Sequence, residues 1–200
     1  MKAKSITDTA ASKRFWRRRL RAKRKSLPFS FRQKAARALP KHGRLLFLRH
    51  KKMGFYFPTP EEMDVGPLMR RALNLGKSIF LPALRRGARL GFYPYIPGKT
   101  TLKKNRFGIL EPFCRKHPVK TASLDLIFLP LVGVDVKGRR LGMGKGYYDR
   151  AISCARKKPF LAGAAFEAQK VQELPADPWD VPLDALLTEN GLYLFSEKKP

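Results

Sequence analysis

The hydrophobic positions of this chain fall into two alternating patterns from residue 44 onward. Short apolar runs bounded by turn residues predict buried strands, and segments whose apolar residues recur on one face predict helices. Helices are predicted over 66–76, with Pro67 near its first turn and Gly76 past its end, and from Tyr147 onward. Strands are predicted at 44–48, 53–57, 78–84, 89–95, 124–132 and 160–166, and the strand-like segments 184–188 and 192–195 close the chain.

The first 40 residues have a different pattern, because basic residues surround a narrow apolar face. Residues 8–26 predict a helix that ends before Pro28. Phe15, Trp16 and Leu20 share one side of that helix and can pack on a core, while Lys and Arg occupy the rest. A second helix is predicted from about residue 30 to residue 39.

Alternation of strands and helices predicts an α/β protein. The expected architecture is a three-layer, Rossmann-like, mostly parallel sheet flanked by helices. We expect a single domain over residues 1–200, with the basic helical segment 1–40 packed on it. Ligand sites in such sheets lie beyond the carboxyl ends of the strands.

Composition narrows the class of protein. A hydrophobic fraction of 44% is enough for a core, and the longest apolar run, 126–134, contains Pro130 and is too short to span a membrane. The basic N-terminus lacks the apolar stretch of a secretory signal. Cys114 and Cys154 are isolated, which predicts a reducing compartment and no structural zinc. We therefore expect a cytoplasmic protein without a membrane partner.

The net charge of +28 is unusual and uneven. Residues 1–52 contain 19 Lys and Arg and a single acid, whereas residues 53–200 contain 24 Lys and Arg and 14 Asp and Glu. Such a charge attracts polyanions, including nucleic acids, nucleotides and anionic small molecules, without choosing among them.

The segment "RRLGMGKGYYDR" (139–150) carries the most specific candidate chemistry. Gly142, Gly144 and Gly146 lie between a predicted strand and a predicted helix, with Arg140 and Lys145 beside them. Backbone N–H groups of such a loop can bind an anion. Its spacing fits neither the dinucleotide GxGxxG motif nor the Walker motif. From the residues alone, both phosphate binding and a structural turn remain open.

Asp149 also has two interpretations. A carboxylate in the first helical turn complements the helix dipole. Beside a bound nucleotide, the same carboxylate would be a Mg²⁺ ligand, since Mg²⁺ in proteins usually takes one or two carboxylates plus phosphate oxygens.

The segment "DLIFLPLVGVDVKGRRLGMGKGYYDR" resembles the signature of the 5-formyltetrahydrofolate cyclo-ligase family, also called 5,10-methenyltetrahydrofolate synthetases. Further similarity lies in "LGFYPYIPGKTTLKKNRFGILEP", in "AGAAFEAQKVQELPADPWDVPLDALLTE" and, more weakly, in "KRFWR". The similar segments extend over nearly the whole chain in the family's order.

The resemblance implies an ATP- and Mg²⁺-dependent cyclisation of 5-formyltetrahydrofolate to 5,10-methenyltetrahydrofolate, with release of ADP and phosphate. Phosphorylation of the formyl oxygen makes the carbon electrophilic and supplies a leaving group, after which N10 attacks. Catalysis of this kind depends on positioning the γ-phosphate and neutralising its charge. The resemblance assigns that catalytic role to Arg140 and Lys145.

The resemblance also implies binding residues. It places Asp149 and Asp180 on Mg²⁺. It places folate near Thr59, Asp64 and Phe107 and on the loop residues Met143, Gly144, Lys145, Gly146 and Tyr147. It assigns ATP to Lys13, Arg17, Arg140, Leu141, Gly142, Met143, Gly144, Lys145, Gly146, Tyr147 and Tyr148.

Several of these residues have simpler interpretations. Lys13 and Arg17 share a helix face by their spacing and would otherwise be a solvated basic face. Asp64 would equally cap the helix that follows, Phe107 would equally be a core residue, and Asp180 would equally be an exposed loop acid. Two positions depart from the family's pattern. Val65 stands where Thr is common, which bears on the roles of Thr59 and Asp64, and Met143 stands in the glycine-rich segment, where Arg140, the three glycines and Lys145 are retained.

Two other functions compete with the enzyme. The charge and the segment "RFWRRRLRAKRK" suit nucleic acid, although no zinc finger, RNP motif or KH loop is present. A nucleotide-binding protein that has lost catalysis is the third possibility, but Lys145, Asp149 and Asp180 are all retained. We expect a monomeric enzyme that binds ATP and 5-formyltetrahydrofolate, including polyglutamylated forms, with nucleic-acid binding only incidental.

Overall fold

The computed structural model describes residues 6–113 and 118–195, so Cys114 lies outside the described residues. A mostly parallel seven-stranded sheet forms the centre, in the order β12-β11-β9-β6-β1-β2-β3. The five inner strands are parallel, and β12 and β3 pair antiparallel at the two edges. Its strands are β1 (Lys52–Gly54), β2 (Ser78–Arg85), β3 (Arg89–Tyr95), β6 (Leu126–Leu129), β9 (Phe160–Ala164), β11 (Ala185–Thr188) and β12 (Gly191–Leu194).

Two small sheets extend this frame. One has the order β10-β7-β8 and the other pairs β4 with β5. Their strands are β4 (Leu102–Lys104), β5 (Leu110–Pro112), β7 (Gly133–Asp135), β8 (Arg140–Leu141) and β10 (Lys170–Val171). Short 3-10 helices are η1 (Arg86–Ala88), η2 (Thr121–Ser123) and η3 (Glu167–Gln169).

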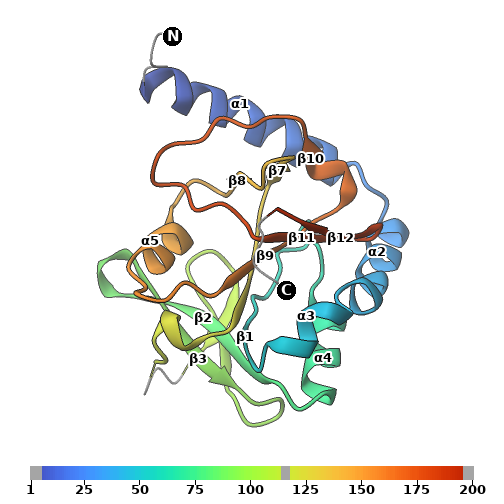
Figure 1. The fold of residues 1–200 in the computed structure, drawn as a ribbon, viewed down its shortest axis with the longest axis vertical. Coiled ribbons are helices and arrows are strands. Elements are labelled where there is room, and N and C mark those ends of the chain that lie inside the picture. Colours follow the sequence, from blue (N-terminus) through green and yellow to red (C-terminus); the bar gives the residue numbers. More distant parts are fainter. Residues whose placement is uncertain (1–5, 114–117, 196–200) are drawn as a thin grey trace.

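Helices cover both faces of the central sheet, as predicted, and Figure 1 shows α2, α3 and α4 together on one side and α5 on the other. Successive residues of β6 explain the two layers: Leu126 and Phe128 pack in the core under α2–α4, whereas Ile127 and Leu129 pack in the core that includes Ile152 of α5. The helices are α1 (Ile6–Lys25), α2 (Phe29–His42), α3 (Arg44–Arg49), α4 (Gly66–Asn74) and α5 (Tyr147–Ser153).

The basic helix α1 lies across the small β10-β7-β8 sheet (Figure 1). Leu20 is buried and packs with Val132, Leu141 and Leu174, and Trp16 packs against the same cluster. A Cβ added to Gly133 would lie 2.3 Å from Leu20 Cδ1, so the helix approaches the sheet closely at a position where only glycine fits. This contact fixes α1 over the region where the glycine-rich segment begins. No helix among the described residues is long and apolar enough to cross a membrane.

Two of the predicted strands differ most from the structure. Residues 44–48, predicted as a strand, form helix α3, in which Leu46 and Phe47 are buried while Leu45 and Leu48 are exposed. The strand predicted over 124–132 is wrong in extent, because β6 ends before Pro130, which has no N–H for a ladder. The remaining residues turn into β7 of the small sheet.

His50 follows α3 and gives the fold a pH dependence. Its ring Nδ1 lies 2.8 Å from the Leu46 carbonyl oxygen, and the ring packs 5.3 Å from that of Phe160. Burial lowers the pKa of His50 below its ordinary value of 6.5, and this outweighs the opposing effects of the Leu46 carbonyl and Asp125. The unfolded chain therefore binds the proton more readily than the folded chain does.

We expect the free energy of unfolding to decrease as the pH falls below about 6.5 and to level off once the pH is below the folded pKa. Thermal unfolding at pH 7.5 and 5.5 checks this, with His50→Gln as the comparison because glutamine can donate to the Leu46 carbonyl but does not titrate. An equal fall in Tm for both proteins would show that His50 is not responsible.

Candidate active site

A cavity of about 840 Å³ lies beyond the carboxyl ends of β1 and β6, where parallel sheets commonly bind ligands. Its walls come from α1, the segment after β1, the β2–β3 hairpin, the β4–β5 hairpin, the glycine-rich segment and residues 177–180. The cavity therefore brings together segments that lie near opposite ends of the sequence.

The glycine-rich segment runs from β8 into α5 and lines this cavity throughout. Gly144 and Gly146 have φ angles of 93° and 62°, in the left-handed region that side chains other than glycine adopt only with strain. A Cβ on Gly144 would also lie 3.2 Å from the Arg17 guanidinium carbon. The glycines thus let the loop turn tightly while the half-buried guanidinium of Arg17 approaches it. Lys145 is exposed on this loop.

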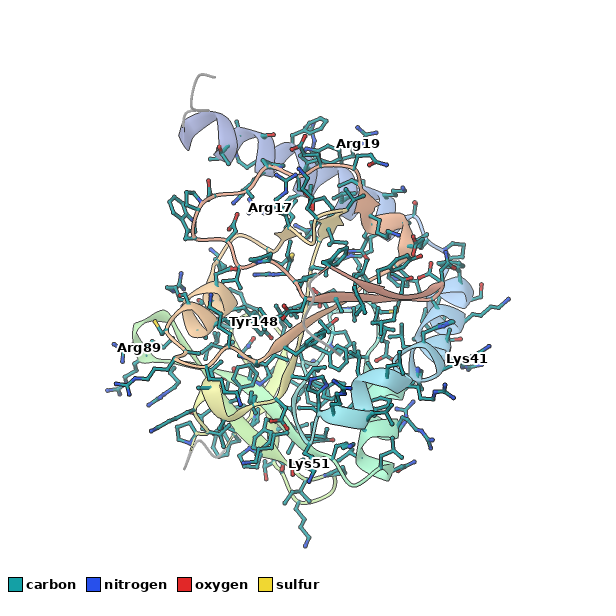
Figure 2. All side chains as sticks on the ribbon, in the orientation of Figure 1. Arg17, Arg19, Lys41, Lys51, Arg89 and Tyr148 are labelled. Carbon is teal, nitrogen blue, oxygen red and sulfur yellow. The ribbon has the colours of Figure 1, made fainter. Side chains whose placement is uncertain are left out.

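Helix α1 contributes two cations to the cavity. Lys13 is only 7% exposed, and its Nζ lies 2.7 Å from Oδ2 of Asp177 and also contacts Asp180. Arg17 Nε donates to the Gly142 carbonyl oxygen over 2.9 Å. Burial lowers the pKa of Arg17, and the charges of Asp180 and Asp177 oppose that effect. The face that carries these residues is therefore turned toward the site rather than toward solvent, and Figure 2 shows Arg17 reaching from α1 toward the loop below it.

Arg140 and Asp149 form a nearly buried pair on the loop. Arg140 Nη2 lies 2.6 Å from Oδ1 of Asp149, and the side chain of Arg140 is 5% exposed. Nε of Arg140 is buried and has no hydrogen-bond partner among the described residues. A buried donor without a partner is costly, and an oxygen of a bound anion would satisfy it.

The structure brings Asp149 and the segment that contains Asp180 together. The amide of Val181, the next residue, donates to Oδ1 of Asp149 over 3.3 Å. Oδ2 of Asp180 accepts from Lys13 and from the amide of Asp177. The hydrogen bonds seen among the described residues thus end on one oxygen of each carboxylate. The other carboxylate oxygen of each residue is a ligand atom of the kind that Mg²⁺ prefers.

No group of three or more His, Cys, Asp or Glu side chains within the described part of the chain forms a metal site by itself. Mg²⁺ in proteins is commonly held by one or two carboxylates together with substrate phosphates, and Asp149 and Asp180 are the carboxylates of the cavity that could hold it in this way.

The opposite end of the cavity is apolar and contains two buried carboxylates. Its apolar wall includes Phe57, Leu90 and Phe107. Glu62 accepts from the Thr59 amide over 2.8 Å, and Glu111 accepts from the Leu84 amide over 3.0 Å. Their side chains face a site large enough for a bicyclic ring system.

Two tyrosines lie at this end, the buried Tyr56 and the half-buried Tyr148. Burial raises the pKa of both Tyr56 and Tyr148, so both phenols keep their protons. Tyr148 lies on α5 close to the β2–β3 hairpin (Figure 2). The phenols are hydrogen-bond donors that do not add negative charge to the site.

All but one of the predicted site residues line the cavity. They include Thr59 and Phe107, and the Phe107 ring lies 6.4 Å from that of Tyr147. Asp64 lies outside the lining, and its Oδ1 accepts from the Gly66 amide at the start of α4 over 2.7 Å. Asp64 thus lies one residue before the N-cap of α4, Val65, and the helix has no side-chain capping hydrogen bond at that position. The folate role of Asp64 stays a prediction.

Several polar or aromatic residues of the lining were not predicted from the sequence, among them Glu62, Glu111, Asp177 and Trp179. For Glu62 a signal existed, since three acids lie within residues 61–64, but only the fold shows which of them turns inward. Asp177 lay two residues after a proline and three before Asp180, and nothing in that spacing indicated the contact with Lys13.

An α/β sheet with a cation-rich glycine loop at the carboxyl ends of its strands is an arrangement typical of enzymes that bind the phosphates of a nucleotide. The model of the 5-formyltetrahydrofolate cyclo-ligase family matches residues 9–189. The chain belongs to that family.

Individual members of the family are similar to the chain in sequence and in structure. The chain is 38% identical over 141 residues to the 5-formyltetrahydrofolate cyclo-ligase of Haemophilus influenzae, covering 68% of this chain and 75% of the relative. It is 37% identical over 136 residues to that of Escherichia coli, covering 66% and 74%. The 5,10-methenyltetrahydrofolate synthetase structure from Aquifex aeolicus superposes with a TM-score of 0.80 at 32% identity, covering 94% of this chain and 95% of that chain.

Proposed function

We propose that this enzyme cyclises 5-formyltetrahydrofolate to 5,10-methenyltetrahydrofolate at the expense of Mg-ATP, releasing ADP and phosphate. The observation that carries the proposal is that a single cavity joins a cationic glycine loop to an apolar end with buried carboxylates. Such a cavity suits a triphosphate at one end and a pterin at the other, with their reacting groups between them.

The chemistry requires the formyl oxygen to attack the γ-phosphorus. The bond between that phosphorus and the β,γ-bridging oxygen breaks, and ADP leaves. N10 then attacks the activated formyl carbon, the C–O bond breaks, phosphate departs, and N10 loses its proton. Positioning and charge neutralisation supply most of the rate enhancement in phosphoryl transfer.

The chain's cations suit the first step. Lys145 is exposed on the loop and is free to follow the γ-phosphate, while Arg140 offers its unpartnered Nε. Arg17 is fixed on the Gly142 carbonyl, so it holds the loop's shape as well as adding charge. Asp149 and Asp180 would hold Mg²⁺, which when bound neutralises the phosphate oxygens.

The apolar end suits the pterin. A buried carboxylate recognises adjacent N–H donors of a planar heterocycle, and Glu62 is the better placed of the two because it lies beside Tyr56 and Thr59. Phe107 and Phe57 offer faces for ring contact. This arrangement would orient N5 and N10 toward the glycine loop.

Replacing Glu62 by glutamine is expected to raise the KM for 5-formyltetrahydrofolate by roughly tenfold or more, because a neutral amide loses a charge-assisted hydrogen bond. The KM for ATP should stay near the wild-type value. The neighbouring Glu61→Gln is the matched control, since Glu61 is not part of the cavity lining. An unchanged folate KM in Glu62→Gln would remove this carboxylate from substrate binding.

The direct test is turnover by the purified protein, followed through the absorbance of the methenyl product. We expect activity with Mg-ATP and none when either ATP or divalent metal is withheld. Absence of turnover in folded protein, together with tight salt-sensitive RNA binding, would favour the nucleic-acid function instead.

We further propose that the enzyme acts in the cytoplasm as a monomer and accepts polyglutamylated folates, with any binding of nucleic acid by the basic helix α1 incidental. Light scattering after size exclusion measures the oligomeric state. A stable dimer would contradict the monomer, and loss of activity on saturation with RNA would contradict an incidental role for nucleic acid.

A further inference from the structure

One face of helix α1 carries cations toward both ends of the cavity. Lys13, Arg17, Leu20 and Arg24 follow one another at spacings of four, three and four residues, so their side chains share that face. Lys13 and Arg17 line the cavity near the glycine loop, and Leu20 packs on the small sheet. Arg24, in the last turn of the helix, lies roughly 16 Å beyond Lys13 along its axis.

Arg24 is a buried cation with few partners. Its side chain is 2% exposed, and Nη1 donates to the Leu131 carbonyl oxygen over 3.3 Å. Its Nε has no hydrogen-bond partner among the described residues. The Leu131 carbonyl also accepts from Nε2 of Gln169 over 3.1 Å, so it does not depend on Arg24. Because burial of a guanidinium is costly unless a nearby charge offsets it, the acids around Arg24 decide what this side chain does.

Two acids lie close to Arg24, and they differ in burial. Nη2 of Arg24 lies 3.9 Å from Oε2 of Glu61, and Nη1 lies 4.0 Å from Oε1 of Glu62. The Glu61 side chain is 33% exposed and does not line the cavity, whereas that of Glu62 is 7% exposed and does. Water screens the attraction to an exposed carboxylate more strongly. Burial lowers the pKa of Arg24, and Glu62 opposes this effect more than Glu61 does. Glu62 is therefore the principal partner.

Glu62 is held from the protein side by two groups. The Thr59 amide donates to Oε2 over 2.8 Å, and Arg24 faces Oε1. Arg24 is not part of the cavity lining, so it approaches the carboxylate from behind the cavity wall. The phenol of Tyr56, which keeps its proton, lines the same wall and adds no charge. A carboxylate fixed in this way presents its remaining lone pairs to the cavity.

We infer that Arg24 is a positioning residue for the folate substrate, which holds Glu62 in place and supplies the counter-charge behind the carboxylate that faces the pterin. The inference rests on the proposed function, because Glu62 meets a pterin only if the cavity binds folate. Arg24 does not touch the substrate, so its effect reaches the reaction through Glu62. Helix α1 thereby orients the group that recognises the folate as well as the loop that binds the nucleotide.

Replacement of Arg24 by methionine, which is long and apolar but uncharged, tests this role. We expect the KM for 5-formyltetrahydrofolate to rise roughly tenfold, while kcat and the KM for ATP stay within about twofold of wild type. Arg24→Lys should recover part of the folate affinity, because it keeps the charge without the guanidinium geometry. Arg18→Met is the matched control, since it removes an exposed arginine from the same helix and should leave both KM values unchanged.

A double-mutant cycle separates positioning from a merely structural role. If Arg24 acts through Glu62, the folate KM of Arg24→Met with Glu62→Gln should exceed that of Glu62→Gln by less than about twofold. Independent effects would multiply instead, to roughly 100-fold above wild type. Arg24→Met with Glu61→Gln should keep the folate KM of Arg24→Met alone, because Glu61 does not line the cavity.

Leaving Glu62 without its cation lowers stability, so the kinetics are measured well below the Tm of each variant. Three results would overturn the inference while leaving the proposed function intact: an equal rise in the KM for folate and for ATP, independent effects in the double mutant, or a folate KM in Arg24→Lys as high as in Arg24→Met. An unchanged folate KM in Glu62→Gln would overturn it together with the pterin role of Glu62. Failure of the wild-type protein to turn over 5-formyltetrahydrofolate with Mg-ATP would instead contradict the proposed function.

Discussion

Replacement of Lys145 by alanine is expected to lower kcat by roughly 10²–10³-fold, the effect typical of removing one group that stabilises charge in a transition state. Lys145 is exposed on a loop whose shape depends on its glycines and on Arg17, so its side chain has no evident structural role. The change in Tm should be within about 2 °C, because surface substitutions away from packed features alter stability little. Steady-state kinetics with Mg-ATP, beside thermal unfolding, measures both quantities.

Lys158→Ala is the control for this variant, since it removes an exposed lysine from the segment after α5. It should retain wild-type kinetics. Lys145→Arg should recover part of the lost activity if charge is what matters, although a guanidinium does not reproduce the position of an ammonium. Turnover near the wild-type rate in Lys145→Ala would show that other groups bear the γ-phosphate charge.

Asp149→Asn is expected to lower kcat by about 100-fold and to raise the Mg²⁺ concentration needed for half-maximal rate. Two effects combine here: the amide is a weaker metal ligand, and the nearly buried Arg140 loses its only salt-bridge partner among the described residues. Leaving a buried charge without its partner is destabilising. We therefore expect a lower Tm as well, measured in the absence of ATP.

A Mg²⁺ titration separates these effects. Glu173→Gln is the comparison, because it breaks the exposed pair with Arg139 outside the cavity and should leave the titration unchanged. If Asp149→Asn lowered Tm but shifted neither the Mg²⁺ titration nor kcat measured well below Tm, the residue would support the loop without contributing to the metal site.

The fold class could be predicted from the alternating patterns, but the ends and identities of short elements could not. An apolar run such as 44–48 fits either a strand or a short helix, and only packing against the sheet selects the helix, with Leu46 and Phe47 turned inward. The small strands β4 and β5 were absent from the prediction. Each has only three residues, which is too few for an alternating hydrophobic pattern to indicate a strand.

The site was predictable where one segment carried several of its parts. The loop from Arg140 to Asp149 is contiguous, so its residue types indicated its chemistry before the fold was considered. Lys13 and Asp177, in contrast, are separated by 164 positions, and their contact depends on how α1 lies over the small sheet. The same holds for residues that are close in sequence. Whether Glu62 or Asp64 lines the cavity depends on the turn that precedes α4, which the sequence did not indicate.

The contact of Lys13 with Asp177 and Asp180 has a consequence for the order in which the enzyme acquires its function during synthesis. A ribosome-bound chain that has not yet reached residue 177 already contains α1, the glycine loop and most of the central sheet. It still lacks the acids that hold Lys13, and it lacks two strands at one edge of the sheet. We therefore expect nascent chains to gain nucleotide affinity late, when residues 177–200 leave the exit tunnel and Asp177 and Asp180 can pair with Lys13 of the first helix.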